Sequence, residues 1–228
     1  GREGPAVHLG ASLAGWMGRR LHLTRSLTRT LLGCGVAAAV AASFNAPIAG
    51  ALFASEVVIG HYALRAFAPI VIASVAGTAV SRAFFGDFPA FALAETPLAS
   101  FWEFPAFVGL GITAGIAAIV FMHTIFSVQQ LSTKTPLPGW LKPAVGGLMV
   151  GLMGLVFPEV LGVGYGLTGD ALLFNISLSM LVVLCLAKIA ATAISIGWGF
   201  AGGVFSPSLV IGALLGGAWG GVVTSLFP

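Results

Sequence analysis

The chain has 228 residues, of which 58% are hydrophobic and only 7% are charged, and its formal net charge is +3. Soluble domains average about 25% charged residues, so this composition excludes an ordinary water-soluble domain and favours an integral membrane protein with several helices. The basic residues are few and are not interleaved with aromatic ones, so nothing supports nucleic-acid binding.

The first predicted element is a small-residue helix over residues 5–18, with Pro5 in its first turn after a glycine-rich loop. The densest basic stretch of the chain follows it and contains Arg19, Arg20, His22, Arg25 and Arg29. The positive-inside rule places this stretch in the cytoplasm. Contact with lipid headgroups on either face of the membrane is the alternative interpretation.

Residues 31–59 are almost entirely apolar, but Asn45-Ala46-Pro47 interrupts them. Proline removes a backbone donor and disfavours helix just before it, so two helices with a break between them are predicted. Such a break is tolerated at membrane depth only against protein or a water-filled cavity. Residues 66–85 form the next predicted span, and the acidic, proline-containing stretch from Asp87 to Glu103 is predicted to be an extramembrane loop.

The second half of the chain also divides at its polar and glycine-rich segments. In chain order we expect a span over 105–127, a polar loop from Gln129 to Lys142, an apolar glycine-rich segment over 143–157, a loop from Pro158 to Asp170, a long span over 171–196, and a glycine-rich lead into the last helix. No strand-like alternation is present. Small residues four apart predict close helix packing in the membrane, and they occur at Gly111/Gly115, Gly147/Gly151, Gly212/Gly216 and Gly216/Gly220.

Three ionisable residues stand out within the apolar parts: Glu3, Glu56 and Lys188. Charge at membrane depth is costly, so each is a functional candidate. Each also has a plain alternative: the dipole of a helix first turn favours Glu3, Glu56 could lie at the interface, and Lys188 could snorkel or pair with a carboxylate. The histidines have no metal-ligand spacing, and no nucleophile–base motif is present, so neither a metal site nor an enzyme is expected.

The most specific pattern is a repeat at an offset of 202 residues. Gly1-Arg2-Glu3-Gly4-Pro5 at one end matches Gly203-Val204-Phe205-Ser206-Pro207 near the other in its first and last residues. Both copies predict a loop followed by a helix start, which is a favourable place to bind an anion. A carboxylate at Glu3 would occupy the same place until an anion or a proton displaced it. This arrangement predicts a gate and pH-dependent transport.

These motifs resemble those of the CLC family of chloride channels and proton/chloride antiporters. Gly1–Pro5 with Val7-His8 resembles the family's second signature, Ser43–Gly50 followed by Glu56 resembles its next helix pair, and Gly202–Pro207 resembles its third filter motif. The resemblance covers the whole chain. It implies an all-α integral membrane fold, part of a bundle of tilted, broken helices with an inverted repeat, and a homodimer with one anion pathway in each subunit.

The resemblance also implies roles for individual residues. Glu3 falls on the gating glutamate, and Val204 and Phe205 fall on positions whose backbone amides contact the central anion. The filter loops and helix starts would be formed by Gly1, Arg2, Gly4, Pro5, Gly203 and Pro207. Val57 occupies the position of the internal proton-relaying glutamate of the antiporters. This departure resembles the channel branch, although some exchangers of the family also lack the acid.

The expected function is therefore transmembrane chloride transport through a glutamate-gated pathway, channel-like or weakly proton-coupled. The alternative is a proton/chloride antiporter whose proton route does not need the usual internal glutamate. A transporter of another substrate and a non-transporting scaffold explain the paired motifs less well. We expect no cofactor, chloride as the substrate, and a multi-pass location in the plasma membrane of a prokaryote. Residues 1–228 would be part of a CLC transmembrane domain, with the first filter motif before them and the inner tyrosine after them.

Overall fold

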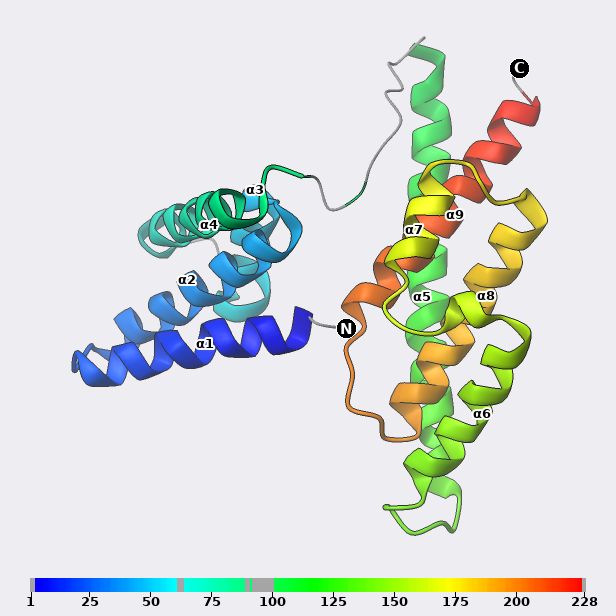
Figure 1. The fold of residues 1–228 in the computed structure, drawn as a ribbon, viewed down its shortest axis with the longest axis horizontal. Helices are drawn as coiled ribbons and strands as arrows, with labels where there is room; N and C mark the ends of the chain where they lie inside the picture. Colours follow the sequence, from blue (N-terminus) through cyan, green and yellow to red (C-terminus); the bar gives the residue numbers. More distant parts are fainter. Residues whose placement is uncertain (1–2, 61–63, 89–90, 92–100, 227–228) are drawn as a thin grey trace. The chain divides into compact units, whose positions relative to one another are not determined.

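The computed structural model describes residues 3–60, 64–88, 91 and 101–226. Every regular element in these ranges is a helix (Figure 1). The chain forms two compact units, an N-terminal unit over Arg2–Ala90 and a C-terminal unit over Phe91–Pro228.

The N-terminal unit is built around one central helix. Its elements are α1 (Glu3–Arg20), α2 (Arg25–Phe44), α3 (Pro47–Phe53), a π-helical turn η1 (Ala54–Ile59) and α4 (Leu64–Phe85). The other helices of the unit pack on α2. The side chains of its core are small or β-branched, as in Val36, Ala37 and Ile70, which lets the helix backbones approach closely. The predicted helix over 5–18 and the span over 66–85 are confirmed.

The predicted break at Asn45-Ala46-Pro47 is confirmed, and a polar cluster holds it. Asn45 ends α2 in the left-handed conformation with φ of 54°, and Pro47 begins α3. The Asn45 side chain accepts a hydrogen bond from Arg82 Nε at 2.7 Å and donates to Asp87 Oδ1 at 3.0 Å. Arg82 and Asp87 also form an ion pair at 3.1 Å. The polar cluster therefore joins the α2–α3 break to the end of α4.

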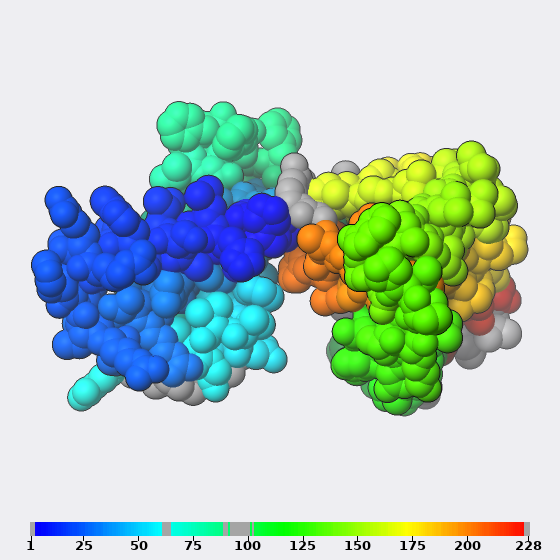
Figure 2. Space-filling model, turned by 90° about the horizontal axis from the view of Figure 1, so that it is seen from below, coloured from blue at the N-terminus to red at the C-terminus, as the bar shows by residue number. Residues whose placement is uncertain are grey.

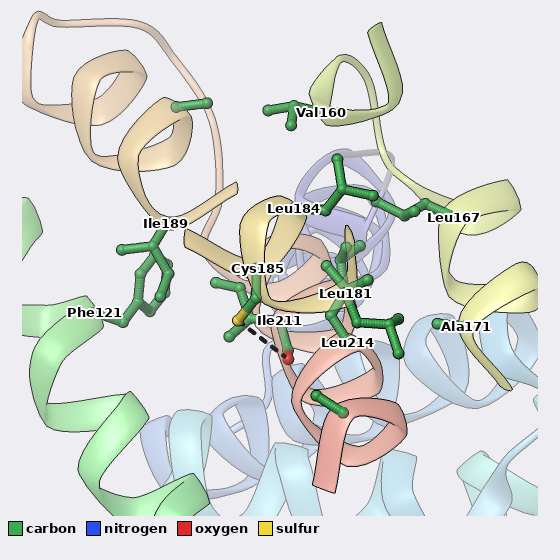
Figure 3. Packing of buried hydrophobic residues seen from close by; sticks show 13 residues of the cluster. Phe121, Val160, Leu167, Ala171, Leu181, Leu184, Cys185, Ile189, Ile211 and Leu214 are labelled. Atoms are coloured by element: carbon green, nitrogen blue, oxygen red, sulfur yellow. Dashed lines mark hydrogen bonds between the residues drawn. The ribbon is translucent and has the colours of Figure 1, made fainter. Parts of the chain in front are cut away.

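The C-terminal unit is arranged around α8, its most buried helix. Its elements are η2 (Phe101–Glu103), α5 (Phe104–Lys134), α6 (Lys142–Val156), η3 (Pro158–Val160), α7 (Tyr165–Leu172), α8 (Leu178–Gly197) and α9 (Phe205–Leu226). Figure 3 shows its core, where Leu181, Leu184 and Cys185 of α8 lie among side chains of α5, α7 and α9. The glycine-rich lead into the last helix is confirmed.

Three predicted boundaries in this unit are wrong. The loop predicted from Gln129 begins only after Lys134, because residues 129–134 contain no proline or glycine and Pro136 is the first residue that stops the helix. The loop predicted over 158–170 contains η3 and the start of α7. The span predicted over 171–196 divides into α7 and α8, because Phe174 takes a positive φ of 58° and Asn175 follows it.

Most of the glycines that were predicted to pack closely make no close contact, and other glycines do so instead. A Cβ added at Gly111, Gly115, Gly212 or Gly216 would meet no atom within 4 Å in the described structure. These glycines lie on faces of α5 and α9 that point away from their unit's own core. Close packing instead occurs at glycines that touch another backbone or a bulky ring, namely Gly10, Gly35, Gly50, Gly77, Gly146 and Gly197.

Five of the described helices are long and apolar enough to cross a membrane. They are α2, α4, α5, α8 and α9, with mean hydropathies between 1.5 and 2.2 in their best windows. Two shorter apolar segments, Pro47–Ile59 and Lys142–Val156, accompany them. Since a span needs about 20 predominantly apolar residues, these lengths agree with the all-α membrane architecture expected from the composition.

Candidate functional site

The first candidate functional element is the start of α1. Glu3 lies in the first turn of the helix and is buried, with 7% of its surface exposed. Pro5 also lies in this turn, where its missing N–H costs no helical hydrogen bond. A carboxylate here is stabilised by the helix dipole. Gly1 and Arg2, which were predicted to shape this loop, lie outside the described residues.

The position of Glu3 is fixed by the packing of α1 on α2. Gly10 and Gly35 touch so closely that a Cβ on either would collide with the carbonyl oxygen of the other. Val7 and Ala11 pack on the core of the N-terminal unit one or two turns after Glu3. The buried carboxylate is therefore mounted on a helix that has little freedom to slide.

The second candidate functional element is the start of α9. Ser208 donates to the Val204 carbonyl from its backbone N–H at 2.9 Å and from its hydroxyl at 2.7 Å. Val204 is thus the cap residue and Phe205 the first helical residue. Pro207 follows in the first turn. The backbone around Val204 and Phe205 is presented at a helix N-terminus, where amides and the dipole favour an anion.

The loop before α9 is accessible within its unit. Gly202 and Gly203 are exposed, and Val204 and Phe205 keep 47% and 37% of their surfaces accessible. Ser206, in contrast, is buried. Glu3 and Gly4 belong to the N-terminal unit and residues 203–207 to the C-terminal unit. The two helix starts are therefore described separately, each within its own unit.

Val57 lies in the π-helical turn η1, a feature that the sequence did not reveal. Val57 is 64% exposed in the described structure, and its neighbour Glu56 is exposed as well. Arg29 of α2 donates from Nη2 to the carbonyl of Ile59 at 2.9 Å and so fixes the end of the turn. π-Helical turns often occur at functional sites. The β-branched run Val57–Ile59, which follows Ala54 and Ser55, was the one local signal of irregular helix.

Lys188 neither snorkels nor pairs with a carboxylate in the described structure. It is buried, with 3% of its surface exposed, and donates to the carbonyl of Val160 at 2.7 Å and of Gly162 at 3.0 Å. Both acceptors lie in the segment between α6 and α7, where Gly162 and Gly164 take positive φ values. Lys188 therefore acts as a tie between α8 and this segment, which sequence spacing alone could not show.

Within the described ranges, no three or more His, Cys, Asp or Glu side chains lie close enough together to hold a metal ion.

The chain belongs to the voltage gated chloride channel family, whose model matches residues 1–228. This match covers both loop–helix starts and the broken apolar helices described above. Together with the five membrane-length helices, membership of this family defines an integral membrane protein.

Individual relatives are channels and transporters. The chain is 34% identical to the chloride channel protein CLC-f of Arabidopsis thaliana over 97% of its length, which is 30% of that protein. It is 33% identical to the H(+)/Cl(-) exchange transporter ClcA of Yersinia pestis over 100% of its length and 49% of that protein. The solved structure of a slow cyanobacterial Cl-/H+ antiporter matches with 26% identity and a TM-score of 0.85, over 100% of the chain and 54% of that structure. The chain thus spans about half or less of each.

Proposed function

We propose that the chain is part of a CLC-type transmembrane domain that moves chloride or a similar anion through a pathway gated by Glu3. The observation that carries this proposal is the pair of loop–helix starts at α1 and α9. One presents a buried carboxylate, and the other presents backbone amides at an accessible helix N-terminus. Membership of the voltage gated chloride channel family supports the same conclusion.

In this mechanism the backbone amides of Val204 and Phe205 hold the central anion. Gly203 gives the loop before α9 its conformational freedom. Pro207 stands in the first turn of α9 and adds no further backbone N–H there. Glu3, with Gly4 and Pro5 shaping its turn, competes with an anion for the N-terminus of α1. A proton or an incoming anion displaces the carboxylate, so that flux rises as the pH falls.

The transport mode we propose is channel-like or weakly proton-coupled, because Val57 cannot carry a proton. The second candidate is coupled proton/chloride exchange through another route. The names of ClcA and of the cyanobacterial antiporter favour it. We further propose a homodimer in the plasma membrane of a prokaryote, with one pathway in each subunit, no cofactor and no enzymatic activity.

A reversal-potential measurement tests the proposal. The full-length protein that contains these residues is reconstituted into liposomes under a chloride gradient with a superimposed pH gradient. A potential at the chloride equilibrium value, unaffected by pH, supports channel-like conduction. A potential displaced by the proton gradient supports the exchanger. No chloride-dependent potential in protein that is folded and inserted would overturn both.

A further inference from the structure

The turn between α1 and α2 concentrates positive charge. Its basic side chains are all exposed, and we call them the basic turn: Arg19, Arg20, His22, Arg25 and Arg29. The chain contains no Asp or Glu between Glu3 and Glu56, so the N-terminal unit offers these side chains no acidic neighbour along the sequence. In Figure 2 side chains project from the blue surface at this end of the α1–α2 hairpin.

The backbone under the basic turn is tightly defined. His22 takes a left-handed φ of 51°, and the N–H of Leu23 donates to the carbonyl of Gly18 at 3.0 Å. A Cβ added at Gly18 would lie 2.8 Å from Cγ2 of Thr28, so the ends of the two helices are in direct contact. The basic side chains therefore project from one short segment whose backbone conformation is fixed.

The guanidinium groups of the basic turn are available to a ligand. Arg29 uses one nitrogen to bind the carbonyl of Ile59. Within the described part of the chain, the guanidinium groups of Arg19, Arg20 and Arg25 make no hydrogen bond or ion pair. Each guanidinium carries five N–H donors in a planar fork that suits phosphate oxygens.

Apolar side chains surround the basic turn and indicate which ligand it meets. Trp16, Leu21 and Leu27 are 58%, 61% and 55% exposed, and they lie within one turn of the arginines. Exposed tryptophan and leucine beside arginine are typical of the boundary between headgroups and acyl chains. A soluble acidic partner would match the charge but not these apolar neighbours. The turn also leads into α2, a helix of membrane-spanning length.

We propose that the basic turn binds the phosphate headgroups of anionic phospholipids in the leaflet that it faces. The arginines contact the phosphates, while Trp16, Leu21 and Leu27 contact the upper acyl chains. Clusters of four or more basic residues next to a membrane helix attract anionic lipid in this way. The proposal uses neither Glu3 nor the start of α9, so it stands or falls separately from anion transport.

Native mass spectrometry of the purified full-length protein tests the proposal, with phosphatidylglycerol and phosphatidylcholine as the probes. The variant Arg20→Gln/Arg25→Gln keeps Arg29, which also holds Ile59. We expect it to bind phosphatidylglycerol about twentyfold more weakly, because each basic residue near the surface contributes roughly a factor of five. Phosphatidylcholine binding should be unchanged.

The matched control is Arg65→Gln/Lys134→Gln, which removes two positive charges at exposed positions elsewhere. It should weaken phosphatidylglycerol binding less than about threefold. Equal binding of the two lipids by the unmodified protein would overturn the proposal, as would equal losses in the two variants. Unchanged phosphatidylglycerol binding in the Arg20/Arg25 variant would also overturn it. Equal thermal unfolding temperatures exclude a folding defect.

Discussion

The starts of α1 and α9 share a motif but differ in what stands at its centre. At the matched position, α1 has Glu3, which is buried, and α9 has Phe205, which is 37% exposed. The matched glycines differ too, since Gly10 touches Gly35 while Gly212 meets no atom within 4 Å. One copy of the motif is therefore a rigidly mounted carboxylate, and the other is an accessible array of backbone amides. The comparison teaches that one repeated helix start can present a buried carboxylate in one copy and an accessible helix N-terminus in the other.

Removing the carboxylate should have the largest effect, because it makes the two helix starts alike. We expect Glu3→Gln to abolish the pH dependence of chloride flux and to leave the pathway open, since glutamine cannot gain a proton. Flux assays in liposomes at acidic and neutral pH measure this effect. The control Glu159→Gln, at an exposed acid of the C-terminal unit, should keep the original profile. A pH profile in Glu3→Gln that matches the unmodified protein would show that Glu3 is not the gate.

Removing one amide from the α9 start should have the next largest effect. Phe205→Pro deletes a charge-assisted hydrogen bond, and proline is tolerated at a first helical position, so we expect chloride to bind about 10- to 100-fold more weakly. Isothermal titration calorimetry measures the affinity. Phe205→Leu keeps the amide and should bind chloride within about threefold of the original. Equal affinities in the proline and leucine variants would remove the amide from the site.

Substitution of the matched glycines tests whether the two helices are mounted differently. Gly10→Ala forces a methyl group against the backbone of Gly35 and should destabilise the protein by about 1–3 kcal/mol. Gly212→Ala adds its methyl group in open space and should leave stability within about 0.5 kcal/mol. Denaturant titration in detergent measures both. Equal losses would mean that α9 is packed as closely as α1.

The smallest effect is expected from substitution of Lys188, which ties α8 to the segment between α6 and α7. Lys188→Met leaves the carbonyls of Val160 and Gly162 without their present donor and should lower stability by about 1–2 kcal/mol. Lys188→Arg keeps donors at this place and should recover most of the loss. The unfolding midpoint is the measurement, and a methionine variant as stable as the original protein would contradict the proposed tie.

Much of this architecture could be predicted because proline and glycine mark it. Pro5, Pro47 and Pro207 each stand in the first turn of a helix, so the helix starts that form the candidate site were predictable. The end of α5 was not, because Gln129 and Gln130 are polar but compatible with helix. The tie made by Lys188 depends on a contact between segments 26 to 28 residues apart, which no local pattern encodes. The prediction of glycine contacts failed for the same reason. The spacing shows that the glycines share one face of a helix, but it does not show which element that face meets.

The length of α5 has a consequence for the surrounding lipid. Its 31 residues extend about 46 Å, against a hydrocarbon thickness of about 30 Å. If the polar stretch 129–134 projects into water, the remaining 25 residues still cover about 37 Å, so this part of the helix is long enough to cross the hydrocarbon layer with some tilt. The packing of α5 on α8 sets the angle of this tilt. A helix of this length therefore adapts to bilayers of different thickness by changing its tilt, at a modest cost in free energy.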